Sequence, residues 1–146
     1  MPTITEIEKC FIRELNNNLP YLKTCDSLAE FLIVTIEELP DKTPAVYVVY
    51  QGGPFTLTTG DTQYADTVFS LIAVARNVRA DESARHGRDG VVGVYEILDD
   101  IRQYMTNNDL GLEMTRLRPL DVEALDGNEE LAIYAARFSS QIRFDL

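Results

Sequence analysis

Ten of the thirteen basic residues are arginines, and four of these gather within a stretch of thirteen residues. Asp81 and Glu82 lie between the four arginines and Asp89 directly follows the last of them, so the local net charge is only about +1. The planar guanidinium group binds carboxylates through two parallel hydrogen bonds, which makes arginine the favoured residue for ion pairs at interfaces. Two interpretations therefore stay open. The cluster forms ion pairs on a solvated loop of its own chain, or it binds an acidic partner such as a second copy.

The carboxylates that could accept such contacts lie on a helix expected over residues 91–106. Three of them fall on its exposed side. The opposite side carries the predicted apolar stripe, Val91, Val94, Tyr95, Leu98, Ile101 and Met105. One further arginine is expected on the polar face of the last strand. A solvated acidic surface is the alternative interpretation of these carboxylates. The candidate subunit interface comprises Arg76, Arg79, Arg85, Arg88, Arg137, Glu96, Asp99 and Asp100.

The chain contains few residues suited to catalysis or metal binding. His86 is the only histidine, and its charged neighbours favour a solvated imidazole over a general base. Cys10 and Cys25 do not form a CxxC motif, and a zinc site requires four ligands. The glycines lack the spacing of a phosphate-binding loop. We therefore expect no catalytic residue, no metal and no cofactor.

Composition and charge exclude several other classes of protein. A chain of 146 residues has the length of one domain, and 45% hydrophobic residues is typical of a globular protein. The net charge of −11 disfavours binding to nucleic acid and to anionic membranes, because both require a basic surface. The N-terminal residues do not resemble a secretory signal, and no apolar run reaches the length of a membrane span. These features predict a soluble cytoplasmic protein.

The positions of apolar residues predict an α+β fold in a single domain spanning residues 1–146. Apolar residues at three- and four-residue spacing predict three helices, and a capping box of Thr3 with Glu6 or of Thr5 with Glu8 predicts the start of the first. A short extended link is expected over 21–25. The first two strands have apolar residues on both faces, which indicates burial on both sides. A long loop is expected over 51–65 and a charged loop over 80–90. The sheet should be mixed or antiparallel, with about four strands and helices packed on it. In chain order the expected elements, α-α-β-β-α-β-β, are helices 3–16 and 27–38, strands 45–50 and 66–79, helix 91–106, and strands 114–123 and 131–144.

The length of the last predicted strand is the first indication of an oligomer. At ~3.3 Å per residue, a strand over 131–144 would extend ~46 Å. A globule of this size has a radius of gyration near ~15 Å, so the strand must span the body or project from it. Projecting strands need a partner, because exposed strand edges promote aggregation.

Six segments, in this order, resemble the small Mu-like phage and prophage proteins encoded in the neck-to-tail part of the gene cluster. The resemblance covers about residues 27–145. Each motif is short, and the signal lies in their order and spacing. The segments are PAVYVVYQG at 44–52, ARNVR at 75–79, GVVGVYEIL at 90–98, NDLGL at 108–112, LRPL at 117–120 and LAIYA at 131–135.

This resemblance implies a fold similar to the tail terminators of long-tailed phages, such as the U protein of phage lambda. Such proteins form rings, usually hexamers, that cap the tail tube and present a surface to the head connector. The implied partners are other copies of this chain, the tail tube protein and the head connector protein. The implied locations are the bacterial cytoplasm during assembly and then the tail or neck of the virion. The family has no catalytic residues to carry over.

Two alternatives remain at this stage. A head–tail connector protein of the neck would share nearly every feature above and would differ in its binding partner. A small α+β enzyme or ligand-binding domain would need a concave pocket that holds Arg76, Arg79 or Tyr104 against Asp99 or Glu113.

Overall fold

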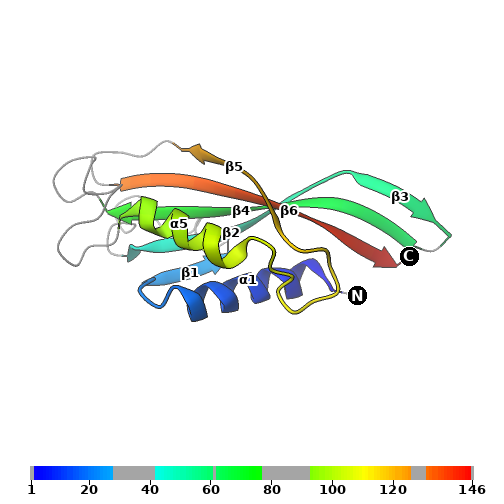
Figure 1. The fold of residues 1–146 in the computed structure, drawn as a ribbon, viewed down its shortest axis with the longest axis horizontal. Coiled ribbons are helices and arrows are strands. Elements are labelled where there is room, and N and C mark those ends of the chain that lie inside the picture. Colours follow the sequence, from blue (N-terminus) through cyan, green and yellow to red (C-terminus); the bar gives the residue numbers. More distant parts are fainter. Residues whose placement is uncertain (1, 28–41, 61, 77–92, 126–130, 146) are drawn as a thin grey trace.

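A mixed six-stranded sheet with two helices against one face forms the described part of the chain (Figure 1). The structure is a computed structural model, and it describes residues 2–27, 42–60, 62–76, 93–125 and 131–145. The α+β class is confirmed, and six strands are present instead of about four. In chain order the elements are α1 (Ile4–Asn18), β1 (Thr24–Ser27), β2 (Ala45–Gly52), β3 (Phe55–Thr59), β4 (Thr62–Arg76), α5 (Val94–Met105), β5 (Arg118–Ala124) and β6 (Leu131–Asp145).

Two predicted segments fall mostly or wholly outside the described residues. The helix expected over 27–38 lies there except for Ser27, which is the last residue of β1. The charged loop expected over 80–90 lies there entirely.

The sheet is built around one long antiparallel ladder. β4 and β6 pair over fifteen residues each, from Thr62 opposite Asp145 to Arg76 opposite Leu131. The strand order is β1-β2-β4-β6-β5, and β3 pairs with β4 beyond the end of β2. Only β1 and β2 run parallel among these pairs. β5 therefore lies at one edge of the described sheet, beside β6.

Two strands, β1 and β3, were not predicted, because each of them depends on pairing with a neighbouring strand. The segment expected as a link at 21–25 enters the four-residue strand β1, which pairs with β2. The prediction of a loop over 51–65 is wrong, because this segment contains β3 and the start of β4, which form a hairpin. Glycine, threonine and aspartate are typical of loops, but threonine is also favoured in strands. Here the segment is a strand and not a loop, because it pairs with the long strand β4.

Gly53 allows this hairpin to form where β2 ends. A Cβ atom at this position would lie 1.6 Å from the carbonyl oxygen of Asp66 on β4. The amide of Asp66 donates a hydrogen bond to the carbonyl oxygen of Pro54 at 3.0 Å. The chain thus passes close against β4 here, and only glycine leaves room for that approach.

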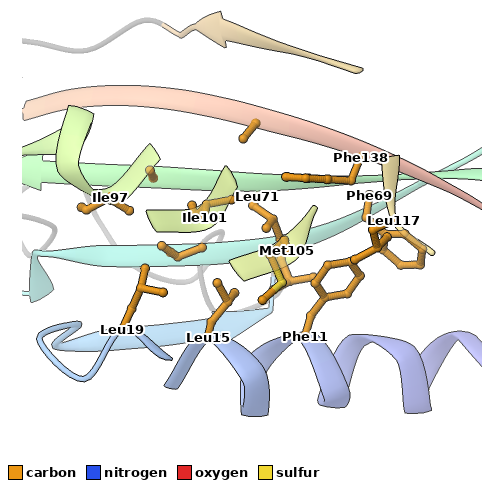
Figure 2. Close-up of a cluster of buried hydrophobic side chains, with 14 of the residues drawn as sticks. Phe11, Leu15, Leu19, Phe69, Leu71, Ile97, Ile101, Met105, Leu117 and Phe138 are labelled. Carbon is orange, nitrogen blue, oxygen red and sulfur yellow. The ribbon is translucent and has the colours of Figure 1, made fainter. Parts of the chain in front are cut away.

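α1 follows the predicted pattern of apolar residues. Ile7, Phe11 and Leu15 are fully buried, and Phe11 and Leu15 point toward the sheet (Figure 2). Thr3 and Glu6 form the predicted capping box, with both hydrogen bonds at 3.1 Å. The helix continues to Asn18, beyond the predicted end at residue 16.

The buried core lies between the two helices and the sheet. Phe69 and Leu71 of β4 face Phe11 of α1 and Ile101 of α5 (Figure 2), and the rings of Phe11 and Phe69 are 5.0 Å apart. Alternate residues of β4 enter a second buried cluster on the opposite face, together with Tyr47. The prediction that β2 and β4 are apolar on both faces is therefore confirmed.

Beyond the ends of both helices, three strands continue as a projecting arm (Figure 1). We define the arm as Phe55–Thr59 of β3, residues 62–66 of β4 and residues 141–145 of β6. The prediction of an overlong last strand is confirmed, because β6 runs through the body and into the arm. The arm is the feature of the fold that most directly raises the question of a partner.

Candidate subunit interface

Of the four arginines in the predicted cluster, only Arg76 lies in the described part of the chain. Arg76 is exposed at the end of β4, opposite Leu131. Arg79, Arg85 and Arg88 lie outside the described residues. Arg76 lies at the opposite end of β4 from the arm, fourteen residue steps or ~46 Å from Thr62 at the tip.

Arg137 has an acidic partner within its own chain. Its Nε donates a hydrogen bond to Oδ1 of Asp121 at 2.7 Å, and its Nη2 donates to Oδ2. The two residues face each other across β5 and β6. Hydrogen bonding to Arg137 lowers the pKa of Asp121, and it raises the pKa of the arginine. The sequence did not identify Asp121, because the pairing depends on a bulge at Leu120 that sets the register of β5.

The carboxylate of Asp100 already accepts a hydrogen bond from a residue that follows α1 in the chain. The hydroxyl of Tyr21 donates to its Oδ2 at 2.6 Å. Burial raises the pKa of Tyr21 well above its ordinary value, and the hydrogen bond to Asp100 and the charges of Asp100 and Glu96 add to that shift. Tyr21 thus stays protonated at neutral pH and remains a donor.

The three candidate acids do not all point the same way from α5. Glu96 and Asp100 are close enough to Tyr21 to act on its pKa. Asp99 instead lies toward β5, where its Oδ1 is 3.7 Å from Nη2 of Arg102. Asp99 and Arg102 are both largely exposed, so this ion pair is screened by solvent. Glu96 is the acid of the three whose side chain has neither an ion pair nor a hydrogen bond to a described residue.

An apolar groove of about 470 Å³ runs between α5 and the edge strand β5. Tyr95 and Leu98 form its helical wall, while Leu120 and Val122 form its strand wall. One of the ion pairs described above, Asp99 with Arg102, lies along it. Arg137 alternates along β6 with Ala136 and Phe138 of the buried core, so its ion pair with Asp121 lies on the opposite face of the sheet. The complete lining is Tyr95, Leu98, Asp99, Arg102, Pro119, Leu120, Asp121, Val122, Ala136, Arg137 and Phe138.

The side of α5 that faces the core differs from the predicted one, and this difference leaves the groove open beside β5. Tyr95 and Leu98 were expected in the apolar stripe that faces the core, but they are only half-buried. Ile97 takes the central buried position, with Val94, Ile101 and Met105. The sequence could have indicated this orientation of α5 through the width of its apolar face. Ile97 widens that face on one side, so Tyr95 and Leu98 fall at its margin.

A second, polar pocket of about 270 Å³ lies where β5 begins, and it contains two arginines that the sequence analysis missed. Arg116 and Arg118 flank the buried Leu117 and are both exposed. Nη2 of Arg118 lies 3.5 Å from the hydroxyl of Ser139, the outer limit for a hydrogen bond. An arginine on each side of a buried leucine is a pattern that the sequence could have revealed.

No group of three or more histidine, cysteine, aspartate or glutamate side chains in the described part of the chain is placed to hold a metal ion. No helix there combines the length and the apolar character needed to cross a membrane.

Comparison with known proteins identifies the family. No curated protein matches the chain. The family described as Bacteriophage Mu, Gp37 matches residues 3–143, which is nearly the whole sequence. The predicted resemblance to Mu-like phage and prophage proteins is confirmed, and the chain belongs to the Bacteriophage Mu Gp37 family.

Proposed function

We propose that the protein is a tail terminator, a structural subunit that assembles into a six-membered ring at the head-proximal end of the tail tube. Its partners are other copies of itself, the tail tube protein and the head connector protein. Assembly takes place in the bacterial cytoplasm, and the ring then becomes part of the virion. Membership of a Mu phage family supports the phage context, and the resemblance to terminators described above supports the position on the tail.

The observation that carries the ring proposal is the projecting arm. Its three strands extend past both helices (Figure 1). Ala65 and Ile142 at its base are buried, and the other arm residues whose side chains are described are exposed or half-buried. Phe55 on the arm is 61% exposed, a large value for an aromatic residue. Strand surfaces of this kind are usually covered by a partner. When the covering surface is a different patch on an identical copy, the contact is head-to-tail and closes into a ring if the rotation permits.

The test is the mass of the protein in solution, measured by light scattering with and without purified tail tubes. Six chains of 16.5 kDa give about 99 kDa. Negative-stain images should show rings, or tubes whose ends carry a cap. The subunit can still purify as a monomer, because a ring that assembles only on the tube forms when the tube is added. A chain that stays monomeric in the presence of tubes contradicts the proposal.

The same experiment separates the terminator from a connector of the neck. A terminator binds the end of the tail tube, and a connector binds the ring on the portal side. Binding to the portal-side ring, without binding to tubes, would place the protein in the neck.

A further inference from the structure

We propose that the groove between α5 and β5 of one copy receives the arm of a second copy, with Phe55 as the anchoring side chain. This inference rests on the ring proposed above, and it names the two surfaces of the chain that meet. Four properties of the described residues lead to it: the apolar walls of the groove, the paired charges along it, the exposed aromatic residue on the arm, and the distance between the two surfaces.

The walls of the groove favour an apolar occupant. Leu98 of α5, Val122 of β5 and the buried Phe138 of β6 all line it. Val122 is 57% exposed on an edge strand, and Leu120 beside it is also exposed. The volume of about 470 Å³ falls within the ~300–1,000 Å³ of sites that bury a ligand. Covering these side chains removes apolar surface from water, which favours association.

The charges along the groove favour an occupant that is uncharged. Asp99 is paired with Arg102 on the α5 side of the groove, while Asp121 is paired with Arg137 on the other face of the sheet. Each ion pair stays intact when an apolar side chain enters, so no charge is left buried without a partner. A basic occupant would have to compete with Arg102 for Asp99. An aromatic ring meets no such competition, and its face can stack on the guanidinium group of Arg102.

The chain carries such an aromatic residue on its own arm. Phe55 is the most exposed of the large hydrophobic residues in the described part of the chain. It lies opposite Ala65, while Tyr50, 40% exposed, lies opposite Phe69. Residues 65 and 69 of β4 point to the same face of the sheet, because successive side chains alternate. Phe55 and Tyr50 therefore present two aromatic side chains on one face of the arm and its base.

One copy cannot bring its own arm into its own groove. Val122 pairs with Ala136 on β6, whereas Phe55 lies across β4 from Ile142 on β6. Six residues along β6 separate these positions by ~20 Å, and three strand spacings across the sheet add ~14 Å in the perpendicular direction. Both surfaces belong to one rigid sheet, so the occupant of the groove must come from another molecule. The contact joins two different patches, which is the geometry of a ring.

Cysteine cross-linking tests this contact directly. In a background of Cys10→Ser and Cys25→Ser, the double variant Phe55→Cys with Val122→Cys is assembled, on tail tubes if needed, and mildly oxidised. A denaturing gel without reductant should show a ladder of covalent multimers up to the full ring. Each single variant should show no ladder. The matched control is Phe55→Cys with Tyr104→Cys, since Tyr104 is 38% exposed on α5 but does not line the groove.

A second variant tests the same contact with both native cysteines in place. Phe55→Ser should raise the protein concentration needed for assembly at least tenfold, and Tyr104→Ser should leave it unchanged. Far-ultraviolet circular dichroism should match the parent protein for both variants. Rings that form normally with Phe55→Ser, or rings without a ladder in the Phe55–Val122 pair, overturn the arm-and-groove contact and leave the ring itself established. Absence of rings from the parent protein, even on tubes, instead overturns the proposed function.

Discussion

At the scale of single residues, the thiol of Cys25 is the group whose chemistry the fold changes most clearly. Burial raises its pKa to about 12, and the neighbouring charge of Asp26 adds to the shift. The ordinary value is about 8.5, and the reactive species is the thiolate. Because the fold disfavours the thiolate, Cys25 should be nearly inert at neutral pH.

We predict that Cys25 reacts with a disulfide reagent at pH 8 roughly two to three orders of magnitude more slowly in the folded protein than in urea. The measurement uses the variant Cys10→Ser, which leaves one thiol. The proton linkage has a definite sign. The folded state holds the proton more tightly, so stability is fully present below about pH 8.5 and falls as the pH rises toward 12. Equal reaction rates with and without urea would contradict this prediction.

The capping box at the start of α1 gives a second prediction at this scale. Thr3→Ala removes the hydroxyl that accepts the hydrogen bond from the amide of Glu6, and it should lower the free energy of unfolding by ~1 kcal/mol. The matched control is Thr5→Ala, an exposed threonine two residues into the helix, where alanine should be neutral or slightly stabilising. Urea denaturation of both variants measures the difference. Equal effects would mean that Thr3 is not the residue that caps α1.

These local features are the ones that sequence predicts best. The capping box requires residues three positions apart, so the sequence alone could reduce the choice to two threonines. The ion pair between Asp121 and Arg137 requires residues sixteen positions apart on two strands. It depends on the register of β5, which a bulge between Pro119 and Asp121 shifts by one residue. No local pattern encodes that register.

At the scale of elements, Gly53 is the position on which the arm depends. Gly53→Ala places a methyl group against the carbonyl oxygen of Asp66, so β2, β3 or β4 must shift. We expect a loss of about 1–3 kcal/mol in the free energy of unfolding, as for other overpacked sites, together with impaired assembly. The effect on assembly should exceed the effect on stability, because the displaced segment is the start of the arm.

Gly60→Ala is the comparison variant for Gly53→Ala. It also alters a glycine of the β3–β4 hairpin, but no atom lies within 4 Å of the added methyl group. Its φ of +58° makes alanine strained there, with a cost of ~1–2 kcal/mol. Urea denaturation and light scattering on both variants separate backbone strain from displacement of the arm. Normal assembly by a folded Gly53→Ala protein would show that the arm tolerates the shift.

Elements were predictable where their own side chains determine them. α1, α5, β2, β4 and β6 have strong periodicity, and each was expected close to its observed place. β1 and β3 are short and polar, and they are strands because a long neighbour pairs with them. The groove was not predictable, because it depends on how far β5 lies from α5 and on the rotation of α5 about its axis.

At the scale of the whole molecule, a net charge of −11 opposes any contact between copies. Repulsion of this kind is screened over ~8 Å at physiological ionic strength, so it acts mainly where two surfaces approach closely. A contact between copies must therefore be locally neutral or join opposite charges. The groove meets the first condition, because Asp99 and Arg102 along it are paired with each other. The arginine cluster near the end of β4 would meet the second.

The contact between the clustered arginines of one copy and the acids of α5 in another remains a prediction, and the structure reduces the choice of acceptor. Of the three acids proposed as acceptors, Asp99 is paired with Arg102 and Asp100 accepts a hydrogen bond from Tyr21. Glu96 is exposed in the first turn of α5 and has no ion pair to a described residue. It is therefore the preferred acceptor. It is also not part of the groove lining, so an arginine from one neighbour and the arm of another do not compete for the same residues.

The experiment is a charge swap across the interface. Arg79→Glu and Arg85→Glu, each alone, should weaken assembly, and combining either with Glu96→Arg should partly restore it in the pair that is in contact. Each exposed pair contributes only ~0.2–1 kcal/mol, whereas removing one partner of a desolvated pair costs ~2–5 kcal/mol because the other charge is left buried. Light scattering at 50 mM and 300 mM salt distinguishes the two cases, since salt weakens exposed pairs far more. If every single variant assembles like the parent protein, the arginines form a solvated loop and the arm-and-groove contact holds the copies together without them.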